Sequence, residues 1–257
     1  MRLALWQGAG VSGDIEQTVA ETAQIATLAK NAGVDLLVFP EGFLTGYYIS
    51  GLASGDLSAV EKALTGVAGI AAEAGLSLVM GTHLDDADAV RNAAVVFSSS
   101  GAEIGRYHKR VLFGGWEQAT FRSGETQLQF TCCGLKVGVL ICYDVEFPEL
   151  VRAYAQAGVD LVVVPTALMA PHDRIARQIV PVRAMENQIF LGYANRTGTE
   201  PGLDFVGLSS IRGPDGVALA EAEAGPQLLI ADIDRQTLEQ HRAESCYLDD
   251  LQKLIKG

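Results

Sequence analysis

GVDLLVFP, from Gly33 to Pro40, is the segment that decides the fold. It returns as GVDLVVVP from Gly158 to Pro165, with six of the eight positions identical, and a helical pattern precedes each copy. Short apolar runs of this kind are typical of strands buried on both faces. Two such strands, each fed by a helix, predict two similar halves, each a sheet with helices outside it. Because no linker composition separates the halves, we expect one α/β domain over residues 1–257.

The other periodic segments fit two such halves. Strands are predicted at 3–7, 35–40, 76–81, 92–97, 103–107, 127–131, 136–141, 160–164, 189–194, 206–212 and 228–233, and helices at 15–31, 56–74, 146–157 and 172–188. Pro181 lies inside the last of these helices, so we expect a break near Val180, with Pro181 opening the second piece. Asp234 is expected to cap a short final helix.

The composition argues against two classes of partner. The chain has 257 residues and a formal net charge of −12, from 19 basic and 31 acidic residues. Such a charge disfavours nucleic acid and anionic membranes. The longest apolar run, 161–170, is interrupted by Pro165 and Thr166 and falls short of the ~20 residues that span a bilayer. We therefore expect neither nucleic acid nor a membrane as a partner.

The cysteines favour a reducing cytoplasm as the location of the protein. Cys132 and Cys133 are adjacent and could hardly bridge to each other without strain, and no pair of cysteines has the CxxC spacing of a zinc site. We expect Cys132, Cys133 and Cys246 to be small apolar residues, buried or half-buried.

Cys142 stands in a different context, after the apolar run KVGVLI and before the polar segment YDVEFPE. The run predicts a buried strand, and the acidic residues and proline predict a helix start. At such a turn, backbone N–H groups and the helix dipole favour an anionic sulfur. Glu41 follows the GVDLLVFP strand, and Lys109 follows the strand at 103–107. In one site, the carboxylate would take the thiol proton, and the ammonium would favour the thiolate and later an oxyanion.

Three motifs resemble the carbon–nitrogen hydrolase (nitrilase) superfamily along essentially the whole chain. They are FPE at 39–41, YHKRVLF at 107–113, and LICYD at 140–144 with FPE at 147–149. The resemblance implies a four-layer α-β-β-α sandwich of two stacked mixed sheets, a homodimer, and a triad of Glu41, Lys109 and Cys142. It also implies that Glu117 orients Lys109 or the substrate amide, and that the backbone N–H of Tyr143 helps to stabilise the oxyanion. No metal or organic cofactor is implied.

The activity that the resemblance implies is hydrolysis of a small primary amide through a thioester acyl-enzyme. In branches that take carboxylate-bearing amides, an arginine commonly stands four residues after the cysteine, whereas this chain has Glu146. The segment 143–149 is similar to that of bacterial 5-aminopentanamidases, whose substrate carries a distal amine. A carboxylate near the pocket would attract such an amine. Glu146 could also be a first-turn glutamate that merely suits the helix dipole.

Similarity to the same branch extends to 44–47 and 164–167. It makes Tyr47, Thr166 and Ala167 candidates for the wall of the substrate pocket. Trp116 belongs either to that wall or to the core.

Other functions fit parts of the sequence. An ω-amidase or an N-carbamoyl amino acid amidohydrolase of the same superfamily would use the same triad. A Cys–His hydrolase would need His83 or His172 to reach Cys142, which no local spacing demands. Nitrile hydrolysis is disfavoured because nitrilases proper usually have Trp-Glu after the cysteine, where this chain has Tyr143-Asp144. A catalytically silent binding module would be free to lose triad residues, and all three are present.

Overall fold

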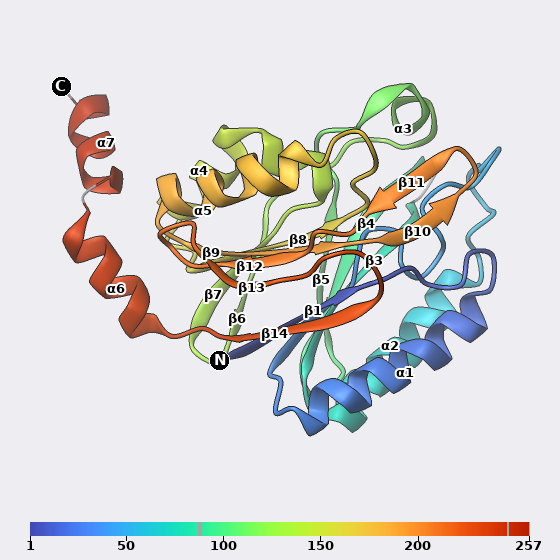
Figure 1. The fold of residues 1–257 in the computed structure, drawn as a ribbon. Helices are drawn as coiled ribbons and strands as arrows, with labels where there is room; N and C mark the ends of the chain where they lie inside the picture. The colour runs from blue at the N-terminus through green and yellow to red at the C-terminus, as the bar shows by residue number, and fades with distance from the viewer. Residues whose placement is uncertain (87–88, 246, 257) are drawn as a thin grey trace.

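Two sheets packed face to face form the centre of the computed structural model, which describes residues 1–86, 89–245 and 247–256 (Figure 1). Helices cover the outer face of each sheet, so the layers run helix, sheet, sheet, helix. The main core cluster draws on both sheets, with Leu5, Val38, Val163 and Leu191 fully buried. The predicted four-layer sandwich is confirmed, whereas a single domain over 1–257 stays a prediction.

The first sheet has the strand order β14-β1-β2-β3-β4-β5. Its strands are β14 (Gln227–Asp232), β1 (Arg2–Gln7), β2 (Leu36–Val38), β3 (Ser77–Asp86), β4 (Ala89–Phe97) and β5 (Glu103–His108). Strands β1, β2 and β3 are parallel, and the remaining pairs are antiparallel. Helices α1 (Ile15–Asn31) and α2 (Val60–Ala74) cover its outer face, and α2 begins four residues later than predicted.

The second sheet repeats this pairing pattern, with the order β13-β12-β9-β8-β7-β6. Its strands are β13 (Ala218–Glu221), β12 (Ser210–Arg212), β9 (Phe190–Asn195), β8 (Leu161–Thr166), β7 (Leu135–Val139) and β6 (Leu128–Cys132). Strands β7, β8 and β9 are parallel, and the outer pairs are antiparallel. Helices α4 (Pro148–Gln156) and α5 (Val180–Asn187) cover its outer face.

The repeated Gly-Val-Asp has the same structural task in both sheets. Asp35, before β2, accepts a hydrogen bond from the backbone N–H of Arg2 at 2.7 Å. Asp160, before β8, accepts one from the backbone N–H of Lys136 at 2.9 Å. Each aspartate thus satisfies a backbone donor at the start of the neighbouring parallel strand, which would otherwise be left without a partner. The sequence repeat therefore marks the central strand of each sheet.

The prediction of one strand at 206–212 is wrong. Leu203–Val206 forms β11, which pairs with β10 (Thr197–Glu200) in a separate hairpin, whereas β12 belongs to the second sheet. Between β11 and β12, Gly207 and Leu208 have φ angles of 65° and 60°. Left-handed backbone at two successive positions ends an extended run. Apolar side chains on both sides of this turn made the two strands resemble one.

Two helices of the second half, α4 and α5, begin at residues other than those predicted. The residues after Cys142 form a 3₁₀ helix, Cys142–Glu146, and α4 begins only at Pro148, so the helix predicted from 146 starts later. A π-helical turn (Ile175–Ile179) leads directly into α5, which begins at Val180. The expected break is therefore a change of helix type at Val180 without an interruption, and Pro181 is the second residue of α5.

At the C-terminal end, Asp234 caps α6 (Arg235–Glu244) as predicted, and a further helix, α7 (Tyr247–Lys256), follows it.

The burial of the cysteines agrees with the prediction at one of two described positions. Cys132 is buried but Cys133 is exposed, so the expectation for Cys133 is wrong, and Cys246 lies outside the described residues.

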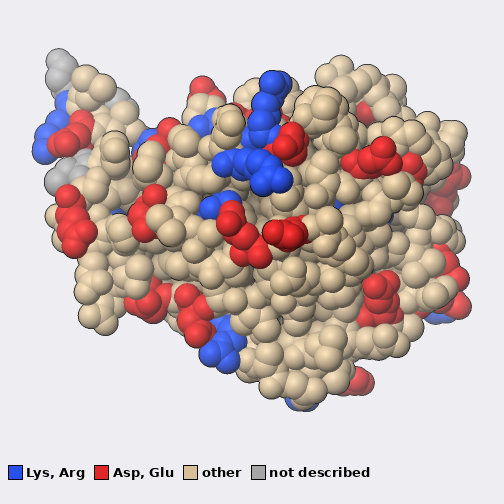
Figure 2. All heavy atoms as spheres, viewed as in Figure 1, with Lys and Arg blue, Asp and Glu red and all other residues tan. Residues whose placement is uncertain are grey.

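Within the described part of the chain, no helix combines the length and apolar character needed to cross a bilayer. On the face shown in Figure 2, basic side chains lie mainly beside acidic ones.

Gly81 in β3 lets the segment that carries Glu41 lie directly against the sheet. A Cβ atom at this position would lie 2.0 Å from the carbonyl oxygen of Pro40 and 2.8 Å from the Cα atom of Glu41. Both contacts are with backbone, so no side-chain rotation can relieve them. The backbone N–H of Leu44 also donates to the carbonyl oxygen of Gly81 at 3.1 Å, which fixes the same segment.

We therefore expect Gly81→Ala to destabilise the protein by about 1–3 kcal/mol, as overpacking does, and to displace Glu41. Gly69→Ala is the matched control, because Gly69 is exposed in α2 and a Cβ there would meet nothing within 4 Å. In a helix that change should stabilise by about 0.5–1 kcal/mol. Thermal unfolding followed by circular dichroism measures both. An unchanged Tm for Gly81→Ala would show that the backbone at Pro40 moves aside freely.

Candidate active site

Strand ends from both sheets supply the predicted triad residues. Glu41 follows β2 and Lys109 follows β5 in the first sheet, whereas Cys142 follows β7 in the second. Cys142 has a φ of 44°, in the left-handed region that residues other than glycine rarely adopt. Such backbone strain concentrates at functional sites, where the surrounding structure holds it in place. The nucleophile candidate thus has a fixed and unusual backbone conformation.

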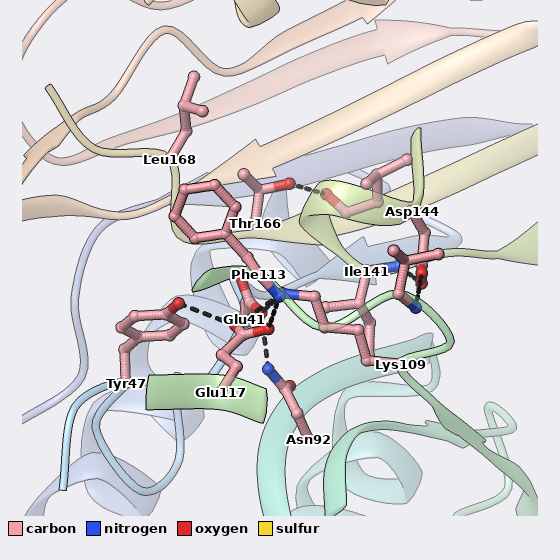
Figure 3. A network of polar contacts seen from close by, with 12 residues as sticks. Glu41, Tyr47, Asn92, Lys109, Phe113, Glu117, Ile141, Asp144, Thr166 and Leu168 are labelled. Atoms are coloured by element: carbon pink, nitrogen blue, oxygen red, sulfur yellow. Dashed lines mark hydrogen bonds and ion pairs between the residues drawn. The ribbon is translucent and has the colours of Figure 1, made fainter. Parts of the chain in front are cut away.

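The ammonium of Lys109 lies between two carboxylates (Figure 3). Its Nζ atom is 2.8 Å from Oε1 of Glu41 and 2.7 Å from Oε1 of Glu117, and all three side chains are fully buried. Glu117 comes from α3 (Gly114–Thr120), close in sequence to Lys109. Burial alone would lower the pKa of Lys109, but the two carboxylates outweigh it and the pKa lies above its ordinary value. The lysine is therefore charged at neutral pH.

The two oxygens of Glu41 have different surroundings. Oε1 accepts hydrogen bonds from Lys109 and, at 2.7 Å, from Nδ2 of Asn92. Oε2 is buried and has no hydrogen-bond partner among the described residues. Burial raises the pKa of Glu41, as does the nearby charge of Glu117, while Lys109 lowers it. One carboxylate oxygen is thus anchored and the other is free to accept a proton.

The thiol of Cys142 is protonated at neutral pH, because its pKa lies above the ordinary value. Burial raises its pKa well above the ordinary value, and the charge of Glu41 raises it further. The charge of Lys109 and a hydrogen bond from the backbone N–H of Ala167 lower the pKa of the thiol. Their combined effect is smaller than that of burial and of Glu41, so the pKa stays above its ordinary value. A protonated thiol needs a base before it can act as a nucleophile.

Asp144 connects the backbone beside Lys109 to the backbone beside Cys142. Its Oδ1 accepts from the backbone N–H groups of Arg110 (3.2 Å) and Val111 (2.8 Å). Its Oδ2 accepts from the Tyr107 hydroxyl at 2.8 Å. The same oxygen accepts from the backbone N–H of Ile141 at 3.1 Å (Figure 3). The carboxylate is fully buried, so these four donors replace its hydration. It holds together two segments that come from different sheets.

Sequence reasoning missed the roles of Asn92 and Asp144. Asn92 opens the predicted strand at 92–97, and a polar residue at the end of an apolar strand is a usable signal. Asp144 lies two residues after Cys142, within the LICYD motif at 140–144. Neither position reveals the contacts with the first sheet, because Glu41, the partner of Asn92, and the segment 107–111, which donates to Asp144, lie far away in the sequence.

A cavity of about 210 Å³ opens at Cys142. Of the predicted pocket residues, Tyr47, Glu146 and Ala167 line it, as does Tyr143. The rest of the wall is formed by Phe113, Leu168, Met169, His172, Arg174 and Ile175. A larger hollow of about 830 Å³ lies beside β11 to β13 and includes none of the triad residues, so the smaller cavity is the candidate substrate pocket.

Two predicted pocket residues lie outside that wall. The Thr166 hydroxyl is fully buried and donates to the carbonyl oxygen of Val164 at 3.0 Å. Trp116 packs against the ring of Tyr47 with a centroid distance of 5.5 Å, so it supports the wall from behind. Tyr47 in turn donates its hydroxyl to Oε1 of Glu117 at 2.8 Å and joins the wall to the charged cluster.

Of the two histidines considered for a Cys–His site, His172 lines the cavity and His83 does not. His172 lines the cavity, with its ring edge-on to Phe113. His83 is fully buried between Thr45 and Trp116, and burial lowers its pKa to about 3, so it is neutral at neutral pH.

Comparison with known proteins agrees with the fold and the geometry. The family model described as "Carbon-nitrogen hydrolase" matches residues 2–243. A Pseudomonas protegens protein described as "Hydrolase in pqqF 5'region" is 38% identical over 97% of this chain and 88% of its own length. An "(R)-stereoselective amidase" from Pseudomonas sp. is 31% identical over 100% of this chain and 93% of its own.

Solved structures include the E41Q mutant of an amidase from Nesterenkonia sp. AN1, with the acetamide moiety of fluoroacetamide attached covalently at its active-site cysteine. It superposes with a TM-score of 0.85 and 35% identity, over 95% of this chain and 94% of its own. Similarity of this extent covers the whole sandwich and every segment that carries the candidate site. The chain therefore belongs to the carbon–nitrogen hydrolase family, and it is a hydrolase of carbon–nitrogen bonds other than peptide bonds.

Proposed function

We propose that Cys142, Glu41 and Lys109 hydrolyse a small aliphatic primary amide through a thioester acyl-enzyme. The observation that carries the proposal is the free Oε2 of Glu41, buried in a cluster whose charges act directly on a protonated Cys142 thiol. The acetamide moiety joined covalently to the cysteine of the Nesterenkonia relative is an alkylated sulfur, so it supports a nucleophilic cysteine at this position. A neutral His83 makes Glu41 the better base.

In the first half-reaction Glu41 takes the thiol proton as Cys142 Sγ attacks the amide carbonyl carbon. The tetrahedral oxyanion is stabilised by the Lys109 ammonium and the Tyr143 backbone N–H. Glu41 then returns the proton to the departing nitrogen, the C–N bond breaks, and ammonia leaves a thioester on Cys142. The raised pKa of Glu41 suits a group that acts as base and then as acid.

In the second half-reaction Glu41 takes a proton from water, whose oxygen attacks the thioester carbon. The C–S bond breaks, the sulfur recovers its proton from Glu41, and the carboxylic acid leaves. Glu117 does not meet the substrate in this scheme. It accepts from Lys109 through Oε1 and from the backbone N–H of Phe113 through Oε2, and so fixes the ammonium.

The substrate class that we propose is an amide with a distal amine, such as 5-aminopentanamide. Glu146 lines the cavity, and Arg183 fixes its backbone by donating to the carbonyl oxygens of Val145 and Glu146 at 3.0 and 2.6 Å. Arg174 also lines the cavity, but it is exposed, so solvent screens its charge more than that of the half-buried Glu146. We therefore expect a cationic group in the cavity to interact more strongly with Glu146 than with Arg174.

We also propose a homodimer formed through helical faces and a cytoplasmic location. The outer helices carry exposed apolar side chains, among them Val182 and Met185 on α5 and Leu254 on α7. Multi-angle light scattering after gel filtration should give the mass of two chains, and the mass of one chain would contradict the dimer. The location rests on the cysteine pattern alone.

Glu41→Gln should lower kcat for ammonia release by about 10²–10⁴-fold, because the amide keeps the shape but cannot take the thiol proton. Cys142→Ala should abolish turnover. Glu61→Gln is the control, since Glu61 is an exposed carboxylate that pairs with Arg106 away from the cavity. The assay should cover neutral, cationic and anionic amides and matching nitriles. Turnover by Glu41→Gln at the wild-type rate would remove Glu41 as the base.

Glu146→Gln should reduce the preference for 5-aminopentanamide over pentanamide, measured as a ratio of kcat/KM values, by about ten-fold, which is ~1.4 kcal/mol of charge interaction. Burial raises the pKa of Glu146 above its ordinary 4.5. In the wild type the preference should therefore be full at neutral pH and fall as the pH drops through that raised pKa. Glu149→Gln, an exposed neighbour outside the cavity wall, should change neither value. Preference for succinamate or N-carbamoyl-β-alanine would favour the anionic-substrate alternatives.

A further inference from the structure

Arg196, directly after β9, places a fully buried guanidinium beneath the segment that carries Glu41. Its Nη1 atom donates to the backbone carbonyl oxygens of Glu41 at 3.2 Å and of Gly42 at 2.9 Å. Its Nη2 atom pairs with Oε1 of Glu200 at 2.5 Å. One planar group thus binds the backbone of the proposed base and a carboxylate of β10.

Glu200 binds the other end of the same segment. Its Oε1 accepts from the backbone N–H of Tyr47 at 3.0 Å and from the Ser12 hydroxyl at 2.9 Å. Its Oε2 accepts from the backbone N–H of Tyr48 at 2.6 Å. Arg196 and Glu200 together therefore hold the segment 41–48 at both ends. That segment carries Glu41 and also Tyr47, which lines the cavity and donates to Glu117.

The same arginine is tied to the part of the second sheet that contacts the thiol. Its backbone N–H donates to the carbonyl oxygen of Thr166 at 3.2 Å. The next residue, Ala167, lines the cavity and gives the backbone hydrogen bond to Cys142. A short path of covalent and hydrogen bonds therefore runs from the Glu41 backbone through Arg196 to the Cys142 side chain.

Stability alone is a weak reason for such a pair. A buried ion pair gains little over apolar residues of the same volume, because both charges lose their hydration. Arg196 also buries its Nε atom with no hydrogen-bond partner among the described residues, which adds to that loss. What a bidentate guanidinium offers over an apolar side chain is direction, because its donors have a fixed geometry.

We propose that Arg196 and Glu200 are positioning residues that set the Glu41 carboxylate against the Cys142 thiol by fixing the segment 41–48 to the second sheet. This inference rests on the proposed role of Glu41 as the base. Neither side chain touches the substrate, so both act through Glu41 and Tyr47. A misplacement of about 1 Å in such a site can lower a rate by about 10²-fold.

Glu200→Gln and Arg196→Lys test the proposal, because each keeps the approximate size of the side chain and weakens the pair. We expect kcat for a neutral amide to fall by about 10–100-fold. We also expect the acid limb of the profile of kcat/KM against pH to move to lower pH, since a loosened segment admits water to Glu41 and reduces the burial that raises its pKa. A merely structural role would not move that limb in molecules that remain folded.

Asp160→Asn is the matched control. Asp160 is 2% exposed, pairs with Arg235 at 2.9 Å and accepts a backbone N–H, but it precedes β8 at the opposite strand end from Thr166. It should lower Tm without changing kcat or the acid limb at temperatures where circular dichroism shows a folded protein. Should Glu200→Gln not fold, Ser12→Ala removes one contact to Glu200 and should move the limb in the same direction by less.

Wild-type kcat and an unmoved acid limb in Arg196→Lys and in the Glu200 or Ser12 variant would overturn the inference, provided that Glu41→Gln shows its loss of turnover. If Glu41→Gln itself keeps wild-type turnover, the proposed function fails instead, and the positioning role fails with it. The two failures are therefore distinguishable in one set of assays.

Discussion

The buried ammonium of Lys109 is the constraint on which the rest of the site depends. A lone charge without water would be very unfavourable, and Lys109 is stable there only because Glu41 and Glu117 both lie within 2.8 Å of its Nζ atom. Those carboxylates come from the end of β2 and from α3, so the charge requirement fixes three separate segments relative to one another. Loss of Lys109 would leave two buried carboxylates without a countercharge.

The charges of the same cluster influence the protonation states of Glu41 and Cys142. Two carboxylates face one ammonium, and a thiol with a raised pKa lies next to them. A further negative charge on sulfur is unfavourable in such surroundings, so the resting nucleophile is neutral. In the proposed mechanism, the free oxygen of Glu41 takes the thiol proton when substrate arrives, and Lys109 offsets the charge that develops on the substrate oxygen.

The two sheets share one pattern of strand pairing, yet the chemistry is distributed unequally between them. Glu41 follows β2, whereas the counterpart strand β8 ends at Thr166 and is followed by Ala167, and these two residues supply a carbonyl oxygen and an N–H instead of a carboxylate. Cys142 follows β7, whose counterpart β1 ends at Gln7. The shared architecture therefore provides rigid strand ends at equivalent places, and contacts between the sheets, such as those of Asp144 and Arg196, connect them into one site.

The sequence by itself determined the layered fold and the candidate site residues. Buried parallel strands show as apolar runs, the repeat from Gly33 and Gly158 marks the centre of each sheet, and Pro181 marks a helix change, because each of these signals is local. The resemblance put Glu41, Lys109, Glu117 and Cys142 in one site. Only the tertiary structure decided that 206–212 is two strands, that Glu146 but not Thr166 lines the cavity, and that the thiol is protonated. Burial and partners such as Asn92 for Glu41, 51 positions away, arise only when distant segments pack together.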